Sequence, residues 1–119
     1  MPVVKLNPDG LKSSLNKNLV TMYYAPWCKH CRTLKPVYEK FATHAETNMP
    51  GIHVVAVDMD KHGRKIKAET IGFSEFGMPI ADQVEGFPTV ILSKRGRFLK
   101  LPPVTHTSES LVSAATSFF

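Results

Sequence analysis

The segment LVTMYYAPWCKHC, residues 19–31, joins the pattern of a buried strand to a closely spaced pair of cysteines. Residues 19–25 are mostly β-branched, aromatic or aliphatic, which is typical of a strand buried inside a sheet. The apolar residues after the cysteines recur at helical spacing: Leu34, Val37, Tyr38, Phe41 and Ala45. A long amphipathic helix is therefore expected to begin at Cys28, with Cys31 further inside it.

A helix start is a favourable place for a reactive thiol. Its unpaired amide hydrogens and partial positive charge stabilise a thiolate, and Lys29 and His30 place further positive charge between the cysteines. We expect the more exposed Cys28 to attack a substrate disulfide and Cys31 to resolve the mixed disulfide. Lys29 and His30 are expected to tune the redox potential, because cations beside a thiolate stabilise the reduced form.

Two other uses of the cysteine pair are less favoured. A structural disulfide across so short a loop removes little chain entropy, roughly 2 kcal/mol in the loop-closure model. A structural zinc site needs four ligands, whereas the sequence has 2 cysteines and 5 histidines without paired spacing. We therefore predict no metal site and no cofactor beyond the dithiol itself.

Outward from this segment, strand and helix patterns alternate along the chain. A strand and a short helix precede it, and a β-branched strand after the long helix completes a β-α-β unit, which implies parallel pairing. The two strands near the end are close enough for an antiparallel hairpin. The expected elements are strands at residues 3–6, 52–57, 89–92 and 97–101, helices at 61–70 and 80–84, a loop at 71–79, and a last helix capped by Thr107 or Ser108.

Length and composition indicate one globular domain over residues 1–119. Hydrophobic residues make up 43% of the sequence and charged residues 21%, as in ordinary soluble proteins. The net charge is +5, and the basic cluster within residues 61–67 is better explained as a solvated helix face than as a nucleic-acid site, because no aromatic residues interleave it. No stretch has the roughly 20 apolar residues of a membrane span, so a membrane is not a predicted partner. For the reason given for the basic cluster, nucleic acid is not a predicted partner either.

The cysteine count and the first residues favour a cytoplasmic location. Residues 1–6 lack the apolar core of a signal peptide, and two cysteines spaced as a pair do not form the scaffold of a secreted protein. Two settings stay open beside this expectation. One is a virus that assembles disulfide-bonded particles in the cytoplasm, and the other is a domain excised from a longer chain.

Two separate motifs carry a resemblance to the thioredoxin superfamily. YAPWCKHC at residues 24–31, followed by LKP at 34–36, resembles the active-site segment of protein disulfide isomerase domains. GFPT at residues 86–89 resembles the loop in which thioredoxin-like proteins place a cis-proline against the cysteine pair. The resemblance implies an α/β thioredoxin fold, with a central mixed four- to five-stranded sheet flanked by helices, over nearly the whole chain.

The resemblance also implies roles for individual residues. Cys28 is the expected nucleophile and Cys31 the resolving cysteine. Phe87 and Pro88 are expected to shape a site for an extended peptide, since a cis X-Pro bond turns neighbouring backbone groups outward. Trp27 is expected to be a partly exposed, substrate-binding ring that shields the cysteines. An ordinary trans proline and a merely packed tryptophan are the alternatives.

The sequence departs from the family pattern at buried positions. Met22 stands where isomerase domains carry a glutamate and thioredoxins an aspartate, which relays the proton of the second cysteine. Ala56 stands where the accompanying lysine lies. We therefore expect slow release of the mixed disulfide, with water or a histidine carrying the proton. The arginine near the last helix of isomerase domains has no clear match, and His106 is the nearest residue.

An extra segment lies near residues 72–79, before the proline loop. Burial in the local core is favoured over an apolar surface for unfolded chains. The apolar residues concerned are Phe73, Phe76, Met78 and Ile80.

The sequence predicts a protein thiol-disulfide oxidoreductase, whether reductase, oxidase or isomerase. Its substrates would be proteins or peptides bearing thiols or disulfides, with an unidentified reductant or oxidant. The main alternative is a redox-inactive peptide-binding module on the same fold. A third is an iron–sulfur carrier, which would be coloured.

Overall fold

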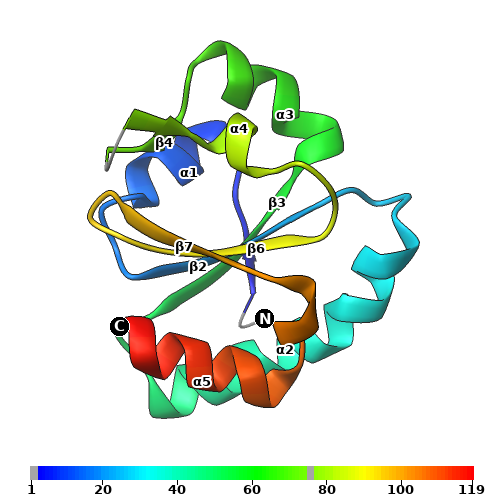
Figure 1. Ribbon diagram of the computed structural model, residues 1–119, viewed down its shortest axis with the longest axis vertical. Coiled ribbons are helices and arrows are strands. Elements are labelled where there is room, and N and C mark those ends of the chain that lie inside the picture. The colour runs from blue at the N-terminus through cyan, green and yellow to red at the C-terminus, as the bar shows by residue number, and fades with distance from the viewer. Residues whose placement is uncertain (1–2, 75–76) are drawn as a thin grey trace.

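The computed structural model describes residues 3–74 and 77–119, built around a mixed five-stranded sheet (Figure 1). The strand order is β1-β3-β2-β6-β7. β2 pairs in parallel with β3 and antiparallel with β6, which in turn forms a hairpin with β7. The mixed sheet predicted above is confirmed. Its strands are β1 Val4–Lys5, β2 Leu19–Tyr24, β3 His53–Asp58, β6 Thr89–Lys94 and β7 Arg97–Leu101.

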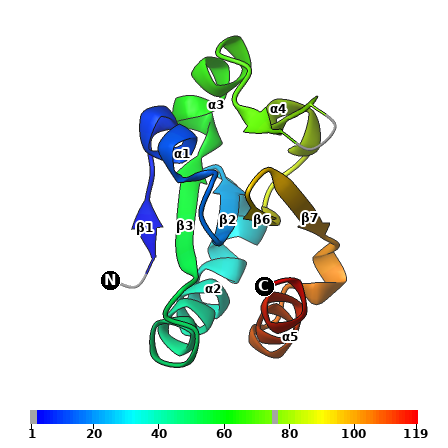
Figure 2. The same ribbon diagram turned by 90° about the vertical axis from the view of Figure 1, so that its left-hand side faces the viewer.

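Helices cover both faces of this sheet. Figure 2 shows α2 and α5 on one face and α1, α3 and α4 on the other. Among residues 3–74 and 77–119, no helix is long and apolar enough to cross a membrane. The helices are α1 Pro8–Ser14, α2 Lys29–Asn48, α3 Met59–Ala68, α4 Ile80–Gln83 and α5 Ser108–Phe118, with a short 3₁₀ helix at Pro103–Thr105.

The central strand β2 is buried on both faces, which explains its continuous apolar pattern. Val20 and Met22 pack in the core beneath α2 and α5, whereas Leu19 and Tyr23 pack in the core on the opposite face. The Tyr38 hydroxyl of α2 lies 3.0 Å from the Val20 carbonyl oxygen and 2.6 Å from that of Val55. This buried contact fixes α2 against the two parallel strands whose carboxyl ends carry the site.

The expected loop at residues 71–79 is wrong in one respect. A small two-stranded antiparallel sheet forms there from β4 Gly72–Phe73 and β5 Met78–Pro79. Strands this short produce no periodicity, so no sequence pattern predicts them. The other expected elements have the observed bounds to within two residues.

The described apolar residues of the extra segment pack into the local core, as expected. Phe73 and Ile80 are 3% and 0% exposed, Met78 is half-buried, and Phe76 lies outside the described residues. The Phe73 ring stacks on Phe98 with a centroid distance of 4.5 Å. The segment is thereby held against the β6–β7 hairpin.

Gly96 is required by the turn of that hairpin. Arg95 and Gly96 both have positive φ angles, 49° and 86°, as in a type I′ turn, and a Cβ on Gly96 would overlap the Ser74 hydroxyl. We expect Gly96→Ala to lower the free energy of unfolding by about 1–3 kcal/mol, measured by urea denaturation. Gly51→Ala is the matched control, because a Cβ there meets nothing within 4 Å. Equal stability of the two variants would contradict this account of the turn.

Candidate active site

Cys28 caps the amino terminus of α2. Its backbone is extended, with φ −81° and ψ 119°, and its amide donates a hydrogen bond to the Ala25 carbonyl oxygen at 3.1 Å. The Cys31 amide donates to Cys28 Sγ at 3.4 Å. Helix N-cap positions favour side chains that accept such bonds, and here the acceptor is sulfur. The helix start predicted from the sequence is thus confirmed, with Cys28 just outside the first turn.

The surroundings of the two free thiols give them different acidities. Cys28 is 8% exposed and Cys31 4%. Burial alone would raise the pKa of Cys28, but hydrogen bonds from Cys31 and from the His30 backbone, with the charge of Arg32, outweigh it and lower that pKa. Burial and the neighbouring Cys28 raise the pKa of Cys31 to about 11. This difference in pKa suits Cys28 as the attacking thiolate, while Cys31 stays protonated until the mixed disulfide is resolved.

The asymmetry predicts selective alkylation of the reduced protein at pH 7. A thiol with a pKa of about 11 is ionised only about once in 10⁴ molecules at pH 7, and one below 9 at least about a hundred times more often. The Cys31 thiolate, once formed, is the more nucleophilic of the two because it is more basic, which reduces the hundredfold advantage of Cys28 by roughly tenfold. We therefore expect iodoacetamide to modify Cys28 at least about tenfold faster than Cys31, measured by peptide mass spectrometry.

The pH dependence of the alkylation rates shows the direction in which the pKa of each cysteine is shifted. The Cys28 rate should reach half of its plateau value below pH 9, since the pKa of Cys28 lies below the ordinary value of 9.0, whereas the Cys31 rate should reach half of its plateau value only at about pH 11. Protein unfolded in urea is the control, in which the two rates should converge. Faster modification of Cys31 in the folded protein would refute the assignment.

The proline loop meets the cysteines across a long sequence separation. The Phe87–Pro88 peptide bond is cis, which confirms the geometry that the resemblance implied. Cys28 Sγ donates to the Phe87 carbonyl oxygen at 3.5 Å, and Phe87 packs against the cluster formed by Ala25, Cys28 and Cys31. The binding roles of Phe87 and Pro88 stay predictions.

Trp27 is an exposed aromatic residue directly before Cys28. It is 64% exposed, which favours the partly exposed ring over the merely packed one. Its ring meets that of Phe87 edge-on, with centroids 5.9 Å apart and an interplanar angle of 74°. Trp27 Nε1 donates to Asp60 Oδ1 at 3.0 Å. Sequence reasoning missed Asp60, because nothing in the sequence links it to a residue so far back in the chain.

A groove of about 400 Å³ runs between the start of α2, the proline loop and the 3₁₀ helix. His30, Phe87, Pro88 and His106 are among the residues that line it. The pKa of His106 is lowered by burial, and its buried Nε2 has no hydrogen-bond partner among the described residues. Lys29, by contrast, is exposed at the first position of α2. His106, the residue nearest to the missing family arginine, therefore lies beside the proline loop.

A second cavity, of about 420 Å³, has Cys31 in its lining. Met22 and Ala56 both line it, and they are direct partners in the parallel pairing of β2 with β3. The two positions identified as departures from the family pattern are therefore neighbours beside Cys31. Met22 and Ala56 are 5% and 2% exposed, so two buried apolar side chains face Cys31 there.

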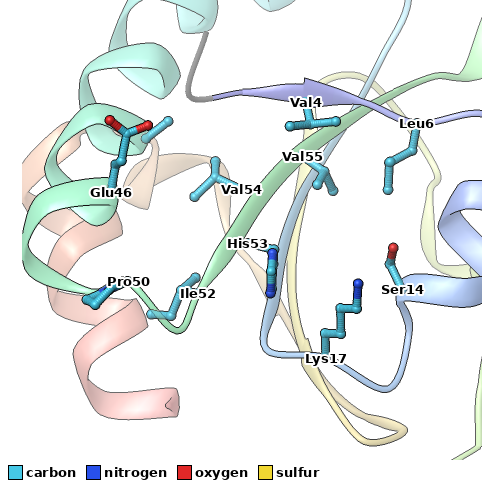
Figure 3. Close-up of a pocket in the computed structure, with 11 residues that line it drawn as sticks. Val4, Leu6, Ser14, Lys17, Glu46, Pro50, Ile52, His53, Val54 and Val55 are labelled. Atoms are coloured by element: carbon cyan, nitrogen blue, oxygen red, sulfur yellow. The ribbon is translucent and has the colours of Figure 1, made fainter.

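Other candidate sites do not meet the cysteines. A cavity of about 510 Å³ is lined by Val4, Leu6, Lys17 and His53, among others (Figure 3). It lies at the amino end of β3, whereas Cys28 follows the carboxyl end of the parallel strand β2. Within residues 3–74 and 77–119, no group of three or more histidine, cysteine, aspartate or glutamate side chains could hold a metal ion.

Comparisons with known proteins identify the family of the chain. The family model described as Thioredoxin matches residues 2–117. Protein disulfide isomerase-like 2-2 of Oryza sativa subsp. japonica is 36% identical over 97 residues, which cover 79% of this chain and 22% of that protein. The protein disulfide-isomerase of Medicago sativa is 33% identical over 97 residues, covering 79% and 17%. The chain thus spans about a fifth of the length of these curated relatives.

Solved structures share the fold. The solution structure of the first thioredoxin domain of mouse protein disulfide-isomerase A4 has a TM-score of 0.75 at 24% identity, covering 98% of this chain and 74% of that one. The crystal structure of the J-Trx1 fragment of ERdj5 has a TM-score of 0.77 at 18% identity, covering 98% and 51%. These likenesses show that the five-stranded sheet and its helices form the thioredoxin fold.

Proposed function

The chain belongs to the thioredoxin family and is protein disulfide isomerase-like, and on that premise we propose that it is a protein thiol-disulfide oxidoreductase. The observation that carries the proposal is the environment of Cys28. Its sulfur accepts a hydrogen bond from the Cys31 amide at the start of α2 and lies 3.5 Å from the Phe87 carbonyl oxygen. A thiol so placed is activated as a nucleophile beside a loop suited to a peptide.

The reaction proceeds by two exchanges at sulfur. The Cys28 thiolate attacks one sulfur of a substrate disulfide, that disulfide breaks, and the other substrate sulfur leaves and takes up a proton. Cys31 then loses its proton and attacks Cys28 Sγ, which forms the Cys28–Cys31 disulfide and releases the second substrate thiol. The substrate gains two electrons and two protons, and an external dithiol or thiol restores the pair. Oxidation of a substrate is the reverse sequence.

The proposed substrates are protein or peptide segments in an extended conformation. The groove beside Phe87 and Pro88 and the exposed ring of Trp27 support this, because Phe87 lines the groove, meets the Trp27 ring edge-on and packs against the cluster that holds both cysteines. Backbone groups next to a cis-proline can pair with an extended chain as a neighbouring strand would. No nucleic-acid or membrane partner is part of the proposal.

We propose that the Cys28–Cys31 disulfide is more oxidising than the corresponding disulfide of thioredoxin. We also propose that residues 1–119 form one domain that works in the cytoplasm. The hydrogen bonds and the Arg32 charge that lower the pKa of Cys28 support the first point, since a stabilised thiolate favours the reduced form. Lys29 and His30 remain the proposed tuning residues. The two cysteines of the sequence both belong to the redox pair, which leaves none for a secreted-type scaffold.

Insulin reduction with dithiothreitol tests the function. We expect the protein to accelerate the precipitation of insulin B chains well above the rate with dithiothreitol alone. A folded protein that gives no acceleration while still binding peptides would instead establish the redox-inactive peptide-binding module. An iron–sulfur carrier would be recognised by the visible absorption of the purified protein.

A further inference from the structure

The cavity beside Cys31 has an apolar inner wall and a polar rim. Met22 and Ala56 form the wall, while Tyr24 and Asp58 stand one strand period further along β2 and β3. Because side chains alternate along a strand, all four lie on the face of the sheet that α2 covers. The rim therefore places a phenol and a carboxylate on the same side of the sheet as the buried thiol.

Tyr24 neighbours both Cys31 and Asp58. The Tyr24 ring packs against the cluster that contains Cys31, and Tyr24 and Asp58 are direct partners across β2 and β3. Burial first, and then the charges of Asp58 and Cys31, raise the pKa of Tyr24. Tyr24 thus stays a neutral phenol, which can donate one hydrogen bond and accept another.

The other groups facing the cavity are less suitable proton acceptors. Glu39 follows Cys31 by eight positions, which places it about 12 Å further along α2. The Tyr38 hydroxyl is held by two carbonyl oxygens of the sheet. The remaining charged groups of this cavity are cations: Lys5, Arg32 and Lys35. Lys61 and His62 line a separate cavity that Tyr24 and Asp58 also border.

On the basis of the proposed oxidoreductase function, we propose that Tyr24 and Asp58 carry away the proton of Cys31 during resolution of the mixed disulfide. The Cys31 thiol gives its proton to the Tyr24 hydroxyl, directly or through water in the cavity, as that hydroxyl passes its own proton to Asp58. The Cys31 sulfur forms a bond to Cys28 Sγ, and the bond from Cys28 to the substrate sulfur breaks. The substrate leaves as a thiolate and is protonated by solvent.

This route uses different atoms from the relay acid of the family. That acid would stand at Met22 on the cavity wall, whereas Asp58 stands on its rim. Asp58 Oδ1 already accepts a hydrogen bond from the Lys61 amide at 3.1 Å and so caps α3. Asparagine at this position keeps an oxygen for the cap but cannot take up the proton.

Single-turnover kinetics of the complete chain with an excess of a disulfide peptide test the relay. Acid quenching and mass spectrometry follow the mixed disulfide from formation to decay between pH 6 and pH 9. We expect Tyr24→Phe and Asp58→Asn each to slow decay of the mixed disulfide by about tenfold at pH 7. This is smaller than the usual effect of removing a general acid or base, because water in the cavity can also accept the proton. The rate of formation, which depends on Cys28, should stay within about twofold of wild type.

Two controls separate the relay from a structural effect. Glu39→Gln alters the other carboxylate of the cavity and should leave the decay rate unchanged. Added imidazole should restore the decay rate of Asp58→Asn in proportion to its concentration and leave wild type unaffected, which loss of packing or capping would not produce.

The outcomes distinguish the relay from the function beneath it. A wild-type protein that resolves its mixed disulfide, with the same decay rate in Tyr24→Phe and Asp58→Asn, would overturn the relay alone. The same follows if Glu39→Gln is the variant that slows decay, or if imidazole has no effect on Asp58→Asn. A folded wild-type protein that never forms the mixed disulfide would overturn the oxidoreductase function, and the relay with it.

Discussion

Replacing Cys28 with serine is expected to abolish insulin reduction, with a loss of roughly 10³-fold or more. A serine hydroxyl is not ionised near neutral pH and its oxygen cannot enter a disulfide, so neither exchange step can occur. The hydrogen bond from the Cys31 amide to Cys28 Sγ can be retained by serine oxygen, because serine is a favoured helix N-cap. The loss should therefore come without a loss of folding, as measured by thermal unfolding.

Cys31→Ser provides the comparison that assigns the two roles. It should also stop turnover, but it should accumulate a covalent adduct between Cys28 and the substrate, detected by non-reducing electrophoresis and mass spectrometry. Wild-type protein alkylated at Cys28 is the control and should form no adduct. Trapping by Cys28→Ser in place of Cys31→Ser would reverse the roles assigned here.

Joint replacement of Met22 by glutamate and Ala56 by lysine is expected to speed decay of the mixed disulfide by about tenfold at pH 7. These residues are partners across β2 and β3 and line the cavity that contains Cys31. A carboxylate at Met22 would take up the Cys31 proton from close by, and a lysine at Ala56 would offset its charge. Quenched-flow mass spectrometry measures the decay.

The single variants serve as controls for this pair. Met22→Glu alone buries an unpaired acid and should lower the free energy of unfolding by about 2–5 kcal/mol, whereas the double variant should be destabilised by less than the sum of its two changes. An unchanged or slower decay in a folded double variant would show that the missing acid does not limit release.

Much of the fold could be predicted because strong local patterns agree with the tertiary structure. The apolar run of β2 is continuous because both faces of that strand are covered, and the stripe on α2 matches the face that packs on the sheet. The cysteine pair at the helix start and the proline loop were predicted from separate motifs. The structure brings them to 3.5 Å from one another, measured from Cys28 Sγ to the Phe87 carbonyl oxygen.

The remaining features arise from contacts that have no local pattern. The Trp27–Asp60 hydrogen bond joins the start of α2 to the first turn of α3, and its polar partner looks like any first-turn acid. The small sheet of β4 and β5 is stabilised by tertiary packing, since two strands so short do not stand alone. The cavity beside Cys31 is lined by Met22 and Ala56, which become neighbours only through the pairing of β2 with β3.

The acidities of the two thiols also depend on the folded environment. The sequence placed cations around the pair, and the structure shows that Arg32 and two backbone amides act on Cys28. The raised pKa of Cys31 follows mainly from burial, which the position of Cys31 inside the helix indicated but the surrounding packing completes. Attack by Cys28 and the delayed ionisation of Cys31 thus have separate structural causes, so they respond to different substitutions.

Equilibration with glutathione redox buffers, followed by acid trapping and mass spectrometry of the thiols, tests the Cys28–Cys31 chemistry most directly. The account predicts that Cys28 and Cys31 lose their thiols together, in one two-electron transition, to give an intramolecular disulfide that glutathione reduces again. The midpoint also reports whether the pair is more oxidising than the roughly −270 mV of thioredoxin, as proposed. A protein in which Cys28 and Cys31 never form that disulfide, or form it without reversal, would contradict the account.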